Sequence, residues 1–241
     1  TLSVRIRQGG SPTTTAISGD GPVEAELVVD DPNVGDRQLI DWSRSDNALV
    51  PAEGFNARTF TFEPGGLVPG LYRLRANVVD TGAPTTVLPV ERWLRIADAS
   101  PPLSDEDDQD GDGIGDATEG AADLDLDGVP DHLDATASPR ELTRRGGETA
   151  ALQTDAGLVL RLGSTAFASG FDADVTLADV AAHGSEGGAA LRAEDEGYAY
   201  PSGLVDFEVH GLERPGASAR VIVPLPAPVP GGARYRKYQH E

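Results

Sequence analysis

Apolar and polar residues alternate along several short segments in the first hundred residues of the chain. In residues 2–7, for example, Leu2, Val4 and Ile6 alternate with polar side chains. A period of two is typical of a β-strand with one face buried. Turns rich in Gly, Pro, Asp and Asn separate these segments. The pattern predicts about six strands, at residues 2–7, 23–29, 38–42, 58–62, 71–79 and 87–96.

The last hundred residues repeat this pattern less regularly. Strands are predicted at residues 158–163, 173–180, 203–212 and 219–225. Eighteen Pro and twenty-nine Gly also favour a turn-rich β protein over a helical one. We therefore predict an all-β chain with two β-sandwich domains joined by a loop segment. The expected boundaries are 1–98 for the first domain, 99–140 for the joining segment and 141–241 for the second domain.

The joining segment contains an acidic repeat. Residues 105–134 hold thirteen Asp and Glu and no Lys or Arg. Within them D-Q-D-G-D-G-I-G-D-A-T-E (108–119) and D-L-D-L-D-G-V-P-D-H-L-D (123–134) superpose at a shift of fifteen residues. Carboxylates at this density repel one another unless a cation lies between them. A hard dication with flexible oxygen coordination fits best, so we expect two or more Ca²⁺ ions.

Calcium loops of this kind take ligands from positions 1, 3, 5, 7, 9 and 12, with Gly at position 6 and a backbone carbonyl at position 7. The first loop supplies Asp108, Asp110, Asp112, Ile114, Asp116 and Glu119. The second supplies Asp123, Asp125, Asp127, Val129, Asp131 and Asp134. Asp134 replaces the usual Glu and is a methylene shorter, and Pro130 stiffens the turn. These two differences predict a weaker or differently closed second site.

Three further expectations concern the surroundings of the loops. Ile114 and Val129 are expected to turn their side chains into small apolar contacts. His132 is expected to be exposed to solvent, because imidazole is a poor ligand for a hard cation. No segment beside either loop is long enough for EF-hand helices. The alternative to calcium binding is a disordered, solvated acidic linker.

The repeated D-x-D-x-D-G-x-x-D motif resembles thrombospondin type 3 repeats over about thirty residues. This resemblance implies a chain that wraps around a string of calcium ions with little apolar core. Residues 1–98 resemble Ig-like or PKD-type β-sandwiches of bacterial surface proteins, through D-W-S (41–43) and G-L-Y-R-L-R-A-N-V-V-D (70–80). The resemblance to Ig-like sandwiches implies that Trp42 is the core Trp and that Tyr72 forms a tyrosine corner. Trp93 is likewise expected to pack in the core.

The C-terminal region resembles the choice-of-anchor U domain of bacterial surface proteins over about forty residues. The resemblance is carried by D-F-E-V-H-G-L (206–212), A-R-V-I-V-P-L (219–225) and the aromatic segment Y-R-K-Y (235–238). It implies a position near the C-terminus of a surface protein and says little about chemistry. One Lys among nineteen basic residues, with abundant Ala and Gly, is also typical of a high-GC bacterial genome.

Composition and motifs exclude several classes of function. A net charge of −21 would repel nucleic acid, and no apolar run approaches the eighteen residues of a membrane-spanning helix. H-G-S-E-G (183–187) lacks the first Gly and the strand-to-helix context of a nucleophile elbow. The four His show no metalloprotease spacing. We therefore expect no enzymatic activity.

These features predict a calcium-stabilised structural or adhesive protein of the bacterial cell surface. Calcium loops of this kind are filled at the calcium concentrations found outside cells, which indicates secretion. The absence of Met implies in addition that a signal peptide has been removed. A more specific hypothesis is a fibre subunit, with residues 2–7 donated as a strand to a neighbouring copy. Its partners would be calcium, copies of itself or other surface proteins. The alternative is a carbohydrate- or protein-binding module of a larger secreted adhesin or enzyme, with Tyr235 or Tyr238 in the binding surface.

Overall fold

The chain divides into two compact units in a computed structural model. The N-terminal unit comprises Thr1–Leu103 with Ala121–Leu126, and the C-terminal unit comprises Ser104–Gly120 with Asp127–Glu241. Strands make up 36% of the described residues and helices 12%, which confirms the all-β class. The structure describes residues 2–30, 35, 37–46, 48–49, 56–82, 85–144, 151–183, 199–200, 203–213, 216–225 and 227–235.

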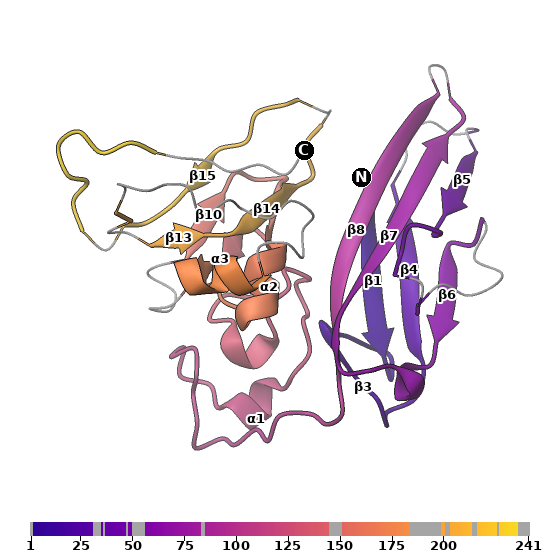
Figure 1. Cartoon of the computed structure of the whole chain (residues 1–241), viewed down its shortest axis with the longest axis horizontal. Coiled ribbons are helices and arrows are strands. Elements are labelled where there is room, and N and C mark those ends of the chain that lie inside the picture. The colour runs from indigo at the N-terminus through magenta and orange to yellow at the C-terminus, as the bar shows by residue number, and fades with distance from the viewer. Residues whose placement is uncertain are drawn as a thin grey trace. The chain divides into compact units, whose positions relative to one another are not determined.

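Two four-stranded sheets build the N-terminal unit (Figure 1). The first sheet has the order β2-β1-β4-β6, made of β2 (Ser11–Pro12), β1 (Leu2–Gln8), β4 (Val23–Val29) and β6 (Thr59–Phe62). The second has the order β3-β8-β7-β5, made of β3 (Thr15–Ile17), β8 (Thr86–Ala97), β7 (Gly70–Asp80) and β5 (Gln38–Asp41). Only the β3–β8 pair is parallel among these strands. A 3₁₀ turn, η1 (Pro64–Gly66), precedes β7.

Alternate residues of both sheets form one apolar core. Val4 and Ile6 of β1 share this cluster with Leu74 of β7 and Leu94 of β8, and each is at most 1% exposed. Two sheets that enclose a common core make a β-sandwich. All six strands predicted in this region are present, with ends that differ by at most one residue. The two strands that the pattern missed, β2 and β3, are only two and three residues long and too short to show a period.

Two aromatic residues confirm the roles expected from the Ig-like resemblance. Trp42 is fully buried, stacks edge-on against Phe60 at 4.8 Å, and donates its indole N–H to the Ala57 carbonyl. The Tyr72 hydroxyl donates to the carbonyl of Val68, four residues upstream, at 2.8 Å. That bond has the form of a tyrosine corner. The expectation for Trp93 is wrong: it is half-buried and lies opposite Arg73, on the face of β8 that points away from the core.

Strand β1 is already paired inside its own unit. It runs antiparallel to β4 along its whole length, from Leu2 opposite Val29 to Gln8 opposite Val23. Its apolar side chains fill the sandwich core. Donation of residues 2–7 to another copy would therefore require this pairing to break first.

Short strands in three small sheets and several short helices form the C-terminal unit (Figure 1). The sheets are β15-β10-β9, β11-β14 and β12-β13. Their strands are β9 (Glu141–Leu142), β10 (Leu152–Thr154), β11 (Val159–Leu162), β12 (Asp174–Val175), β13 (Leu204–Val205), β14 (Phe207–His210) and β15 (Val221–Ile222). The helical elements are α1 (Asp116–Glu119), η2 (Asp131–Leu133), α2 (Ser164–Ser169) and α3 (Leu177–His183). None of the described helices has the length and apolar character needed to cross a membrane.

The strand predicted at residues 173–180 is wrong beyond Val175. Residues Leu177–His183 form α3 instead. Thr176 and Asp179 build a capping box, because the Asp179 amide donates to the Thr176 hydroxyl oxygen and the Thr176 amide donates to the Asp179 carboxylate. This local start signal overrides the apolar alternation that suggested a strand.

The predicted strand at 203–212 is divided at Asp206. The Asp206 carboxylate turns away to accept hydrogen bonds from the Thr165 and Ala166 amides at the start of α2. Its side chain thus satisfies amides that the first turn of a helix leaves without partners. The strand predicted at 219–225 is shorter than expected and covers Val221–Ile222.

Two segments discussed above lie partly outside the described residues. Tyr235 is described and is 80% exposed, whereas the remainder of the Y-R-K-Y segment, with Tyr238, is not among the described residues. Of H-G-S-E-G only His183, the last residue of α3, is described.

Candidate metal centre

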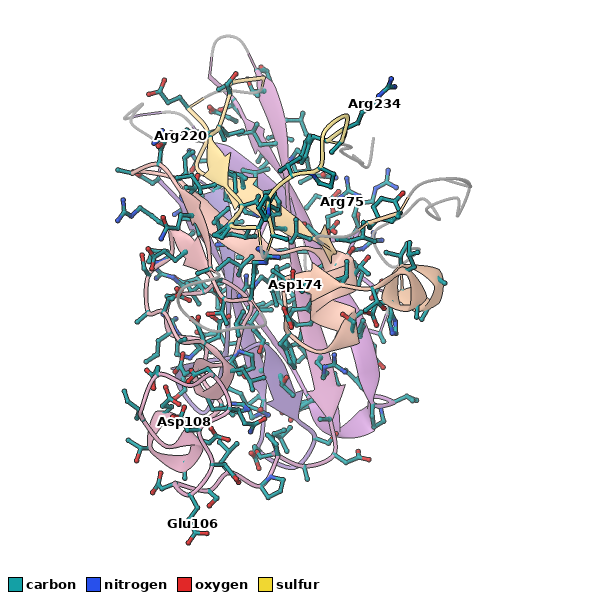
Figure 2. The ribbon with its side chains drawn as sticks, turned by 90° about the vertical axis from the view of Figure 1, so that its left-hand side faces the viewer. Arg75, Glu106, Asp108, Asp174, Arg220 and Arg234 are labelled. Carbon is teal, nitrogen blue, oxygen red and sulfur yellow. The ribbon has the colours of Figure 1, made fainter. Side chains whose placement is uncertain are left out.

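The first acidic loop gathers three carboxylates. Oxygens of Asp108, Asp110 and Asp112 lie within 4.8 Å of one another. Figure 2 labels Asp108 in this loop. It also labels Glu106, whose side chain points away from the loop at the bottom of the view. Calcium binds oxygens at 2.3–2.6 Å, so two ligand oxygens of one ion lie at most about 5 Å apart. Positions 1, 3 and 5 therefore converge as the sequence predicted.

Backbone amides of the loop hold these carboxylates in place. The bonds are Gly111 N to Asp108 Oδ1 (2.8 Å), Gly113 N to Asp108 Oδ2 (3.2 Å), Asp112 N to Asp110 Oδ1 (3.0 Å) and Ile114 N to Asp112 Oδ1 (2.7 Å). Bonds from a side chain to an amide two to five residues later coil the backbone tightly. Gly113 has a φ of +96°, a conformation that favours glycine at this sixth position. The repeated Asp therefore shape the loop as well as supply its charge.

Asp116 closes onto the start of the same loop. It begins the single turn of α1 and is almost fully buried. Its two carboxylate oxygens accept the backbone amide and the side-chain amide of Gln109. These hydrogen bonds, the side-chain one first, lower the pKa of Asp116 below its ordinary value. Sequence analysis missed Gln109, because nothing in the loop motif specifies position 2.

Two carboxylate oxygens of this loop are buried with no hydrogen-bond donor among the described residues. They are Oδ2 of Asp110 and Oε2 of Glu119. Burial, followed by the charges of Asp110, Asp112, Asp116 and Asp108, raises the pKa of Glu119 to about 7. Burial is also the main cause that raises the pKa of Asp110. A cation among these oxygens would supply the missing partner and would reduce the repulsion between the carboxylates.

We expect the metal-free protein to lose stability as pH rises from about 4.5 to about 7. The folded-state pKa of Glu119 lies above its ordinary value of 4.5, so the folded state binds the proton more tightly and ionisation disfavours folding. Melting temperatures of chelator-treated protein across this range would show the decline. Glu119→Gln should have a flatter profile, because its side chain does not ionise. Equal slopes for the two proteins would contradict the assignment.

Gly115 allows the chain to cross itself at the entrance to this loop. A Cβ at this position would lie 2.7 Å from the Asp105 Cα and 2.8 Å from its carbonyl oxygen. We expect Gly115→Ala to cost about 1–3 kcal/mol of stability and to weaken metal binding at the first loop, measured by thermal melts and calcium titration. The control is Gly231→Ala, where a Cβ meets no atom within 4 Å. Indistinguishable variants would argue against this crossing.

The expectation that His132 is exposed is wrong. Its side chain is 5% exposed, and both its backbone N and its ring Nδ1 lie near the Gly120 carbonyl, at 3.1 and 3.0 Å. Gly120 ends α1, whereas His132 lies in η2. The imidazole therefore fastens the end of the second loop to the helix of the first. Sequence analysis assigned no such role because the two residues are twelve positions apart.

The second loop also gathers its first three acidic positions. Oxygens of Asp123, Asp125 and Asp127 lie within 4.8 Å of one another, and Asp123 and Asp127 are fully buried. Val129 is buried as expected, whereas the Ile114 side chain is 46% exposed, so the apolar contact expected for Ile114 is wrong. Ile114 falls in a loop whose backbone turns toward its carboxylates and leaves the side chain outside.

The later positions of the two loops are arranged differently. Glu119 is within electrostatic reach of the first carboxylate group. Asp134 instead accepts three hydrogen bonds on Oδ1, from the Thr136 amide and from the hydroxyls of Thr136 and Thr143. Asp131 lies in η2. Asp116, Glu119, Asp131 and Asp134 do not join either 4.8 Å group among the described residues.

A buried arginine that sequence analysis did not link to the loops contacts the second one. Arg92 Nη2 lies 2.7 Å from Asp123 Oδ2, and Arg92 Nη1 donates to the Leu126 carbonyl at 3.1 Å. Arg92 is on the same face of β8 as the core residues Val90 and Leu94. A charged residue at a core-facing position of an alternating strand is a signal that a buried partner exists.

No protein-family model, curated protein or solved structure matches this chain. The resemblances to thrombospondin type 3 repeats, Ig-like sandwiches and choice-of-anchor U domains therefore stay predictions. What can be said of function depends on the geometry of the two acidic loops.

Proposed function

We propose that residues 105–134 bind two or more Ca²⁺ ions and that the protein is a calcium-stabilised structural or adhesive component of the bacterial cell surface. The observation that carries this proposal is the first loop. Three carboxylates converge within 4.8 Å. One oxygen of Asp110 and one of Glu119 are buried there with no hydrogen-bond donor among the described residues. A disordered acidic linker would not be expected to bury carboxylates or to fix them with backbone amides.

The chemistry of the donors favours calcium over other metals. All candidate side-chain ligands are carboxylates, which suit hard cations. The chain has no Cys, and His132 already contacts a backbone carbonyl. A flexible loop with many carboxylates suits Ca²⁺ better than Mg²⁺, which requires a near-octahedral shell and keeps several waters. Weak sites of this kind fill where calcium is millimolar, which supports a location outside the cytosol.

Calcium would act here as a structural element. Bound ions would cancel the repulsion among carboxylates and stabilise the folded form of the loops. A structural role at the surface is the simplest use of such a segment in a chain whose N-terminal unit is a β-sandwich. A fibre remains one form of this proposal, but it would need a contact other than donation of β1, because β1 pairs with β4.

Titration calorimetry of chelator-stripped protein, with thermal melts, tests the proposal. We expect two or more ions to bind and the melting temperature to rise. Asp112→Ala should abolish binding at the first loop, whereas Glu106→Ala, an exposed acidic residue in the same segment, should leave it intact. No binding at millimolar Ca²⁺ would reduce the segment to an acidic linker and remove the main support for a surface role.

A further inference from the structure

The two acidic loops differ in the cations that the chain itself supplies. In the first loop, the carboxylates of Asp108, Asp110 and Asp112 accept hydrogen bonds from backbone amides of the loop. The second loop begins at Asp123, whose carboxylate forms an ion pair with Arg92. Arg92 and Asp123 are 7% and 0% exposed, so this pair is shielded from water. Arg92 therefore places a positive charge beside the first carboxylate of the second loop.

Arg92 also fixes the backbone that follows Asp123. Its second nitrogen donates to the Leu126 carbonyl, and the Asp123 amide donates to the Pro12 carbonyl at 3.3 Å. Residues Ala121–Leu126 belong to the N-terminal unit together with β8. None of these three contacts involves a metal ion. The start of the second loop is therefore held by the sandwich through hydrogen bonds and one buried charge pair.

We propose that Arg92 acts as a built-in cation of the second loop. It keeps residues 121–126 ordered without calcium and lowers the affinity of the second loop, so the first loop fills before the second. The order of filling rests on the proposed calcium function; the anchoring by Arg92 does not. Arg92 lies in β8, outside the acidic repeat.

The physical basis is charge competition. A dication at the second loop would lie a few ångströms from the guanidinium that already neutralises Asp123. Repulsion between a dication and a monocation about 5 Å apart reduces affinity more than tenfold even at the dielectric constant of water. Screening is weaker in a buried environment, so the reduction is not smaller there. In the first loop no Lys or Arg of residues 105–134 opposes the ion.

Two measurements on the full chain test the proposal. Calcium titration calorimetry should resolve a tighter and a weaker step; Asp110→Asn should remove the tighter step and Asp125→Asn the weaker one. Arg92→Met should raise the affinity of the weaker step tenfold or more, and Arg92→Lys should leave it low. Hydrogen exchange in chelator should show residues 121–126 protected in the wild type and less protected in Arg92→Met, with the exchange of 108–119 the same in both.

The outcomes separate this inference from the calcium function itself. Binding at both loops with equal affinity, or loss of the tighter step in Asp125→Asn, would overturn the order of filling while leaving calcium binding intact. Absence of any binding would overturn the calcium function, and hydrogen exchange would then decide the anchoring alone. If Arg92→Met does not fold, the wild-type, Asp110→Asn and Asp125→Asn titrations still decide the order.

Discussion

Arg92→Met is expected to lower the free energy of unfolding of the N-terminal unit by about 3–5 kcal/mol. The substitution keeps most of the side-chain volume and removes the charge. Asp123 is fully buried, so its carboxylate would lose the cation that lies 2.7 Å away and could not turn to water instead. The Leu126 carbonyl would lose its donor as well. Chemical denaturation of metal-free protein, followed by the fluorescence of Trp42 and Trp93, which both lie in this unit, would measure the loss.

Arg220→Met is the matched control, and its loss of stability would be measured by circular dichroism on the C-terminal unit, which holds both Arg220 and Asp155. Arg220 Nη2 lies 2.7 Å from Asp155 Oδ1, the same separation as in the buried pair, but the two side chains are 73% and 49% exposed. Exposed pairs contribute about 1 kcal/mol or less, because water screens both charges. Equal losses for the two variants would show that the Arg92–Asp123 pair is not buried as described.

Trp42→Ala is expected to cost about 3–5 kcal/mol of the same unit's stability. Trp42 is fully buried between the sheets and contacts Phe60 edge-on. Its removal would leave a cavity and would free the Ala57 carbonyl of its indole donor. Denaturation with Tyr fluorescence or circular dichroism would report the change.

The other tryptophan of the chain serves as the control for that prediction. Trp93 is half-buried on the face of β8 that points away from the core. Trp93→Ala should therefore cost clearly less, since less apolar area leaves contact with the protein. A larger loss for Trp93 than for Trp42 would contradict the placement of the core between the two sheets.

The N-terminal sandwich could be predicted from sequence because its strands are long and one face is buried. In β1, β4 and β7 the alternation of apolar residues matches the alternation of buried side chains, and β8 departs from it at Arg92 and Trp93. The C-terminal unit was harder, since most of its strands have two to four residues. A strand of two residues has no measurable period. The capping box at Thr176 and Asp179 was visible in the sequence and outweighed alternation there.

The loop carboxylates could also be predicted, because the motif fixes both their spacing and the glycine between them. The contacts around the loops could not. Arg92 reaches Asp123 across thirty-one residues, and His132 reaches Gly120 across twelve. Such partners depend on how strands and turns are brought together, which spacing along the chain does not encode. The burial of His132 was mispredicted for the same reason.

The most direct measurement is a crystal structure of the protein grown in millimolar calcium, with an anomalous difference map. We expect a peak within 2.3–2.6 Å of oxygens from Asp108, Asp110 and Asp112, and a second peak of lower occupancy beside Asp125. A well-ordered first loop with no anomalous peak at these carboxylates would contradict the central claim that residues 105–134 bind calcium.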